Sequence, residues 1–201
     1  PRELAKSLAK LVPNAFVVDT HNIIPTWVAS QKLEFAAHTF RPKVHRLLQT
    51  FLVEPEQLQS HPFDFNNADL GIGFDEARNA IKSIPKAGIR VTTLSGEKAA
   101  RDHLQKFITG NLSEYAHGRN DIAHDQQSGL SPYLHFGQLA SLRVALEVLK
   151  RVNKAPLLFR EAKMAQAGED PSTEDGVNAL FEEMIVRKEL SDNFCLHAKS
   201  Y

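Results

Sequence analysis

Apolar residues recur at spacings of three and four along most of the chain, which is the pattern of helices with one buried face. They predict a helix over 40–51 and a second helix that is capped by Ser95 and ends at Gly110. Two more are expected, near 139–149 and from about Thr173 to Asn193. The positions assigned to their buried faces are, in chain order, Phe40, Val44, Leu47, Leu48, Phe51; Ala100, Leu104, Phe107, Ile108; Leu139, Leu142, Leu146, Leu149; Val177, Leu180, Phe181, Met184.

One short run departs from this helical pattern. The residues from Ala15 to Val18 are apolar and partly β-branched, which suits a fully buried strand of a parallel sheet. A strand followed by an amphipathic helix indicates the end of an α/β unit, whose other strands would lie upstream. Between Leu52 and Leu94 the chain is rich in proline and glycine, the composition of a linker, with a helical piece near 74–84.

Composition narrows the class of protein. Lys plus Arg and Asp plus Glu each number 24, so a nucleic-acid surface would have to be a local patch. The single Cys195 excludes an intrachain disulfide framework. No apolar stretch approaches the roughly 20 residues that span a bilayer, and the histidine pairs lack partners for a metal site. We therefore expect an intracellular protein without membrane or metal; the missing initiator Met indicates an internal fragment.

A polar loop opens a helix at residues 128–137, Ser-Gly-Leu-Ser-Pro-Tyr-Leu-His-Phe-Gly. Ser131 is expected to be the N-cap and Pro132 the first helical residue. Backbone N–H groups at such a start can bind an anion, and nearby hydroxyls can reach a phosphate. The residues alone leave open a capped helix that contacts only water, and His135 is expected to be a structural histidine.

Three ordered blocks resemble the photolyase and cryptochrome family. They are Tyr-Ala-His-Gly-Arg-Asn-Asp at 115–121, the loop at 128–137, and the stretch from Glu182 to Cys195. With Val-Asp-Thr-His-Asn at 18–22, the third block resembles the class II cyclobutane pyrimidine dimer photolyases.

The resemblance implies an organisation in three parts. Residues 1–54 would be the C-terminal part of a Rossmann-like α/β domain, 55–94 an interdomain linker, and 95–201 the first part of a helical FAD-binding domain. The expected fold class is thus α/β followed by all-α. One side of the flavin pocket would lie outside the chain, so the isolated chain is expected to be inactive.

The resemblance also implies which residues bind the cofactor, a reduced and non-covalently held FAD. They are Tyr115, Gln127, Ser128, Gly129, Leu130 and Ser131, although Gln127 stands where the family has Leu or Thr. By residue type alone, Tyr115 could equally be half-buried with its hydroxyl in water. An antenna chromophore of unspecified identity is a second cofactor that the family can carry.

Glu183 aligns with the family's active-site acid, which hydrogen-bonds a carbonyl of the thymine dimer. Helical spacing places Glu183, Arg187, Leu190 and Phe194 on one stripe. The alternative is an i,i+4 ion pair between Glu183 and Arg187 on a solvated surface. Arg187 and Lys188 would meet DNA phosphates.

The implied function is DNA repair in which light-excited reduced FAD splits cyclobutane pyrimidine dimers in UV-damaged DNA by electron transfer. The alternatives are a cryptochrome-like blue-light receptor without repair activity and a folded remnant with no activity. The resemblance further implies a monomer, located in the cytoplasm or nucleus.

Overall fold

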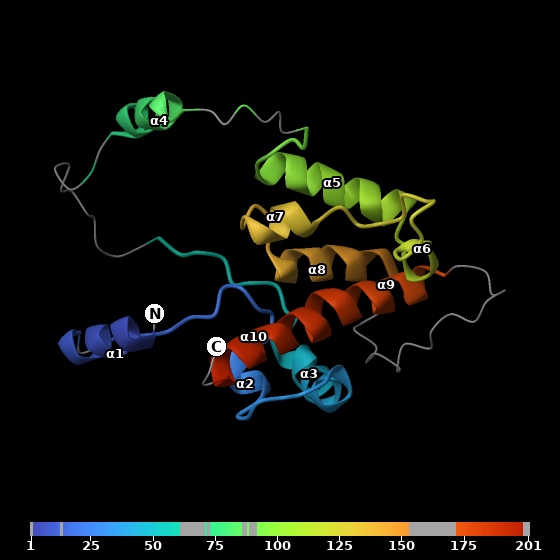
Figure 1. Cartoon of the computed structure of the whole chain (residues 1–201), viewed down its shortest axis with the longest axis horizontal. Helices are drawn as coiled ribbons and strands as arrows, with labels where there is room; N and C mark the ends of the chain where they lie inside the picture. Colours follow the sequence, from blue (N-terminus) through green and yellow to red (C-terminus); the bar gives the residue numbers. More distant parts are fainter. Residues whose placement is uncertain are drawn as a thin grey trace. The chain divides into compact units, whose positions relative to one another are not determined.

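The computed structural model describes residues 2–12, 14–60, 71, 73–85, 88, 92–152 and 172–198. All regular secondary structure within these residues is helical (Figure 1). The chain divides into two compact units, one made of residues 1–54 and 95–201 and the other of residues 55–94. The division of the chain into three functional parts stays a prediction, and much of the predicted linker, including 61–70 and 89–91, lies outside the described residues.

Both units contain helices. The described part of the second unit contains α4 (Phe74–Ser83), in the predicted place. The first unit contains α1 (Arg2–Leu11), α2 (Thr26–Ala29), α3 (Ala37–Phe51), α5 (Glu97–Gly110), α6 (Tyr115–Gly118), α7 (Ser131–His135), α8 (Ser141–Val152), α9 (Thr173–Phe181), the π-helical segment η1 (Glu182–Arg187) and α10 (Lys188–His197).

The core of the first unit lies among α3, α5, α8, α9 and η1 (Figure 1). α5 contacts α8, α8 contacts α9, and η1, which continues α9, contacts α3. The apolar faces predicted for α3, α5 and α9 are confirmed, since their residues are buried or pack against the buried cluster. The face predicted for α8 is confirmed by the same measure, because Leu139, just before the helix, is buried and the other three leucines pack against the cluster. The prediction left out the most deeply buried residues of the helix, which are Val144, Ala145 and Val148. Small and β-branched side chains suit this helix because it packs against α5 on one side and α9 on the other.

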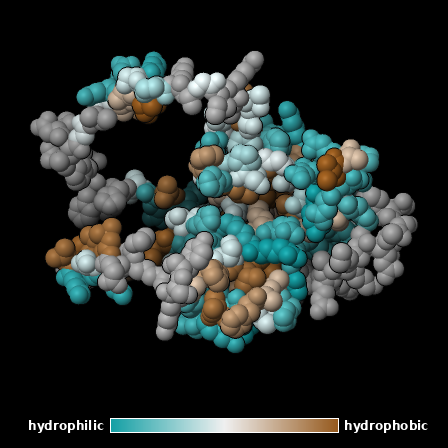
Figure 2. All heavy atoms as spheres, viewed as in Figure 1, coloured by the Kyte–Doolittle hydropathy of each residue, from teal (hydrophilic) through white to brown (hydrophobic). Residues whose placement is uncertain are grey.

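The buried strand expected from Ala15 to Val18 is not formed. These residues have neither helical nor strand structure, and Phe16, Val17 and Val18 are exposed. A buried strand needs neighbouring strands to satisfy its backbone N–H and C=O groups, and the described residues offer none. The α1 helix likewise exposes apolar side chains, seen as brown spheres at its position (Figure 2).

Two predicted helix caps are wrong. Gly96, with φ at 102°, precedes α5 and donates its N–H to Gln138 Oε1 at 2.7 Å, so Ser95 is not the cap. Ser131 is the first residue of α7, and the residue before it is Leu130. The Leu130 carbonyl accepts from Leu134 N at 3.0 Å, and its buried side chain anchors the start of the helix.

The last predicted helix begins at Thr173 as expected, because the Ser172 hydroxyl accepts from Asp175 N at 3.1 Å. It is not uniform. Between α9 and α10 the backbone widens into the π-helical segment η1, which holds Glu182 to Arg187. Helical structure continues to His197, beyond the predicted end at Asn193.

Gly176 allows α9 to pack closely against the backbone that leads into α6. A Cβ added there would lie 1.7 Å from the Leu112 carbonyl oxygen, whereas nothing lies within 4 Å of one added at Gly110. In a helix, Gly→Ala ordinarily stabilises by about 0.5–1 kcal/mol. We expect Gly176→Ala to lower the free energy of unfolding by about 1–3 kcal/mol, since the two segments must separate. Urea unfolding checks this, with Gly110→Ala as the control that is neutral or stabilising; equal effects at the two positions would contradict it.

Candidate functional site

A cavity of about 320 Å³ in the first unit gathers most of the residues that the sequence singled out. The predicted residues that line it are Tyr115, Ser128, Leu130, Ser131, Glu183 and Lys188. His21, His135 and Met184 also line it, and sequence reasoning did not place them there. The cavity joins four separate stretches of chain: the turn that carries His21, the start of α6, the loop into α7 with α7 itself, and the helix that runs from α9 through η1 into α10.

Tyr115 is buried at the start of α6, so the half-buried alternative is wrong. Its ring meets Phe107 edge-on, with 5.4 Å between centroids. The Arg119 guanidinium carbon lies 5.9 Å from the centre of the Tyr115 ring. Burial raises the pKa of the Tyr115 phenol above its ordinary value, so the hydroxyl stays protonated and can donate a hydrogen bond.

The loop into α7 presents its two serines to the cavity. Leu130 is buried, and its N–H lies 3.4 Å from the Ser128 hydroxyl. Gly129 has φ at 61°, a conformation that favours glycine, and does not line the cavity. Ser128 and Ser131 therefore provide hydroxyls on either side of a short turn.

Two residues of the same region differ from expectation. Gln127 lies away from the cavity; its amide contacts the Arg119 carbonyl at 3.4 Å, and it lines a separate polar hollow of the 119–125 loop. His135 is exposed and lines the cavity, with its ring edge-on to Phe136 at 4.8 Å. His135 was expected to be a structural histidine with its hydrogen bonds made inside the protein. That expectation is wrong, because the side chain is exposed and faces the cavity.

Glu183 lies in η1, where its side chain is 38% exposed and lines the cavity. Its Oε1 is 3.3 Å from Arg187 Nε and 3.6 Å from Arg119 Nη2. The i,i+4 ion pair that the sequence offered as an alternative is therefore present, in a side chain that also reaches the cavity. A π-turn widens a helix locally, and such turns are frequent at functional sites.

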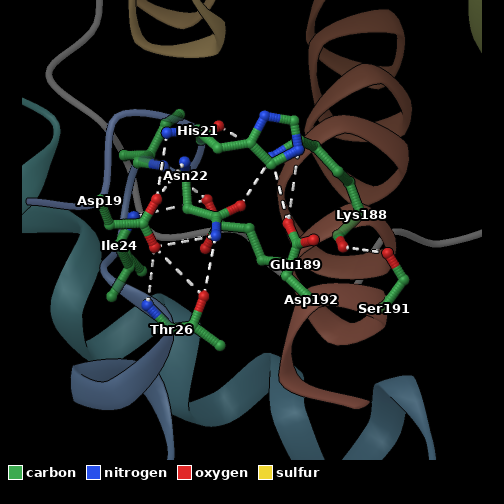
Figure 3. Close-up of polar contacts among 10 residues, drawn as sticks. Asp19, His21, Asn22, Ile24, Thr26, Lys188, Glu189, Ser191 and Asp192 are labelled. Atoms are coloured by element: carbon green, nitrogen blue, oxygen red, sulfur yellow. Dashed lines mark hydrogen bonds and ion pairs between the residues drawn. The ribbon is translucent and has the colours of Figure 1, made fainter. Parts of the chain in front are cut away.

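Arg187 and Lys188, the two basic residues predicted to contact DNA, differ in how far their side chains are exposed and bound by the protein. The Arg187 side chain is 57% exposed. Lys188 is held within the protein: its Nζ donates to His21 O at 2.8 Å and Asn22 Oδ1 at 2.6 Å, and lies 3.5 Å from Asp192 Oδ2 (Figure 3). A phosphate at Lys188 would have to share an ammonium group that already has three partners.

Figure 3 shows that the short motif at 18–22 lies against α10. The Asp19 carboxylate accepts hydrogen bonds from the backbone N–H groups of His21, Asn22 and Thr26 and from the side chains of Asn22 and Thr26. Burial acts to raise the pKa of Asp19, but these bonds outweigh it and lower the pKa below the ordinary value. The resulting rigid turn places His21 at the cavity.

Glu189 fastens this turn to α10 and is a residue that sequence reasoning missed. Its side chain is fully buried, and Oε1 accepts from Ile23 N at 2.8 Å and Ile24 N at 3.4 Å. Among the described residues, Oε2 has no hydrogen-bond partner. Burial raises the pKa of the Glu189 carboxyl to about 7. Nothing in the local pattern signals this, because Glu189 follows two basic residues in a charged run typical of a surface.

Comparison with known proteins gives a consistent assignment, although no family model matches the chain. The chain is 34% identical over 210 residues to the deoxyribodipyrimidine photo-lyase of Potorous tridactylus, covering 100% of this chain and 34% of that protein. The protein of the same name from rice is 35% identical over 191 residues, covering 92% of this chain and 34% of that protein. The one from Methanothermobacter thermautotrophicus is 31% identical over 184 residues, covering 92% of this chain and 36% of that protein. Over its whole length the chain is thus similar to proteins named deoxyribodipyrimidine photo-lyase.

The chain spans about a third of the length of these curated photolyases. In the part of the chain that the structure describes, no cluster of three His, Cys, Asp or Glu side chains is arranged to hold a metal ion. Within the same residues, no helix has the length and apolar character needed to cross a bilayer.

The raised pKa of Glu189 predicts how the stability of the fold depends on pH. Its folded-state pKa, about 7, lies above the ordinary value of 4.5, so the folded state binds the proton more tightly than the unfolded state. The contribution of Glu189 to the free energy of unfolding therefore falls as pH rises from about 4.5 to about 7. Glu189→Gln keeps the acceptor for Ile23 and Ile24 without titrating. We expect the variant to gain stability relative to the wild type between pH 5 and pH 8, measured by urea unfolding; parallel curves would contradict this assignment.

Proposed function

We propose that this chain is part of a class II cyclobutane pyrimidine dimer photolyase, in which light-excited reduced FAD repairs UV-damaged DNA by electron transfer. The observation that carries the proposal is the cavity, because it gathers residues from all three blocks that resemble the family's flavin and lesion motifs. The second and third blocks are separated by more than forty residues of sequence, so their meeting is not a consequence of local spacing.

The residues at the cavity fit a flavin. Tyr115, Ser128 and Ser131 supply hydroxyls suited to phosphate or ribityl oxygens, while Leu130 and Met184 supply apolar surface. Gln127 and Gly129 shape the loop rather than face the cavity. When bound, FAD supplies a photoexcited electron donor. A volume of about 320 Å³ is at the low end for ligand cavities, which supports the proposal that the chain alone is inactive and that other residues of a full-length protein complete the pocket.

Glu183 is the residue we assign to the lesion. Its carboxyl reaches the cavity from η1 and, in the protonated form, would donate a hydrogen bond to a dimer carbonyl as negative charge develops there. Arg187, with its exposed guanidinium, is the better placed of the two proposed phosphate contacts. Lys188 would contribute while still bound to the turn at 21–22.

The N-terminal residues fit the remaining part of the proposal. Residues 1–54 would end a Rossmann-like α/β domain, 55–94 would connect it to the helical FAD-binding domain, and 95–201 would begin that domain. The exposed apolar side chains of Phe16, Val17 and Val18 support this, because a sheet in the full-length protein would cover them. An antenna chromophore, a monomeric state and a cytoplasmic or nuclear location complete the proposal.

Loss of both loop hydroxyls should weaken flavin binding in the full-length protein. Hydrogen bonds to charged groups contribute about 1.5–3 kcal/mol each, so we expect Ser128→Ala with Ser131→Ala to raise the Kd for FAD at least about tenfold. Titration of flavin fluorescence measures this. The matched control is Ser7→Ala with Ser83→Ala, two exposed serines on α1 and α4. Unchanged flavin affinity in the loop variant would remove these serines from the cofactor site.

Glu183 should affect repair and leave flavin binding unchanged. Glu183→Gln keeps a hydrogen-bond donor and should retain part of the quantum yield of dimer repair, whereas Glu183→Ala should lose about two- to tenfold or more. The yield is measured at matched flavin occupancy in the full-length protein. Glu97→Gln is the control, because Glu97 forms an exposed i,i+4 ion pair with Arg101. Wild-type yields in both Glu183 variants would leave Glu183 as half of an ion pair.

The same assay separates repair from light sensing. A flavin-containing full-length protein that never repairs a pyrimidine dimer under blue light would favour the cryptochrome-like receptor.

A further inference from the structure

His103, on α5, contacts the loop that carries the two serines. Its Nε2 lies 3.0 Å from the Ser128 carbonyl oxygen, and its ring lies 5.6 Å from the ring of Tyr133 in α7. A carbonyl oxygen can only accept, so Nε2 carries the proton and donates it. His103 does not line the cavity, which means that it can act on a ligand only through the loop.

Gly129 leaves room for this imidazole. A Cβ at Gly129 would lie 2.5 Å from His103 Nε2 and 3.0 Å from its Cε1, closer than such atoms approach. The φ of +61° at Gly129 is also one that side-chain-bearing residues rarely adopt. The loop and His103 therefore fit each other at the one residue of the turn that has no side chain.

The contact has an electrostatic consequence for an anionic ligand. A backbone carbonyl that faced the cavity would repel a phosphate, and it would compete with the N–H and O–H groups around it. Hydrogen bonding to His103 directs the Ser128 carbonyl toward α5, while the Ser128 and Ser131 side chains line the cavity.

We propose that His103 is a positioning residue for the flavin-phosphate loop, which holds the Ser128 carbonyl away from the cavity and so orients the two serine hydroxyls toward the diphosphate. This inference rests on the proposed flavin site. It adds a residue outside the cavity to the set that decides how strongly the cofactor is held.

Three substitutions at this helical position separate a hydrogen bond from packing, since all three residues favour helices. His103→Gln keeps a donor for the Ser128 carbonyl, His103→Leu keeps bulk without a donor, and His103→Glu offers only acceptors when ionised. We expect the Kd for FAD in the full-length protein to rise about tenfold for Leu and more for Glu, and to stay within about twofold of wild type for Gln. The control is Gln105→Leu, an exposed position on the same helix, which should leave the Kd unchanged.

Hydrogen exchange of the flavin-free, full-length protein provides the second measurement. The amides of Leu130 and Ser131 should exchange faster in the Leu and Glu variants, and at the wild-type rate in the Gln variant. Wild-type exchange and affinity in the Leu variant, or equal losses in all three, would overturn the proposal. If the wild-type protein binds no FAD, the proposed function fails, and the exchange rates still decide whether His103 orders the loop.

Discussion

The structure depends most on one buried carboxyl group, that of Glu189. Residues 19–36 contain only the four-residue helix α2, so most of their backbone groups cannot be paired within regular structure. Glu189 accepts from two of these amides at once. Further along the same face of α10, Asn193 accepts from Glu34 N at 2.8 Å and donates to Lys32 O at 3.0 Å, and His197 Nε2 lies 3.1 Å from Ser30 O. Side chains four residues apart on α10 thus supply hydrogen-bond partners to the backbone of the irregular segment, as a neighbouring strand does in a sheet.

Two ion pairs connect α3 to the same part of the structure: Arg41 pairs with Glu182 of η1, and Lys43 pairs with Glu34 of the irregular segment. The Arg41 guanidinium binds both carboxylate oxygens of Glu182, at 2.7 and 2.9 Å, and this pairing, against some opposing burial, lowers the pKa of Glu182. Burial acts to raise the pKa of Glu34, yet hydrogen bonds from Lys43 and Ser30 lower it to about 2. Since Glu182 and Glu183 are adjacent in η1, the pairing with α3 holds the backbone that presents Glu183 to the cavity. The site is therefore oriented by contacts that lie outside it.

The helices and their buried faces were predicted well because they follow from the local periodicity of apolar residues. The buried faces of α3, α5 and α9 could be read from apolar spacing, since a helix that packs on one side must repeat every three or four residues. The gathering of Tyr115, Ser128, Ser131 and Glu183 was anticipated through family resemblance rather than periodicity. The failures at the two caps, the strand, Glu189 and His103 involve partners far away in the chain.

Ser95 and Ser131 look like caps in isolation, but the long-range bond from Gly96 to Gln138 and the burial of Leu130 decide where α5 and α7 begin. The strand at 15–18 fails for want of neighbours. Glu189 and His103 were missed because each contacts a backbone group from another part of the chain, Glu189 at Ile23 and His103 at Ser128. No window of local sequence contains both members of either pair.

The π-helical segment is a place where this helix can change its length. In an α-helix each residue turns the following chain by about 100°, so removing one residue from α10 would rotate everything after the deletion. Asn193 and His197 would then leave the face that serves residues 30–34. The bonds of η1 span five residues, so each of its residues turns the chain by less. Removing one residue from 182–187 would therefore let the segment close into an α-helix with little rotation of α10. A one-residue deletion should be better tolerated in η1 than in α10, although it would shift Glu183 at the cavity.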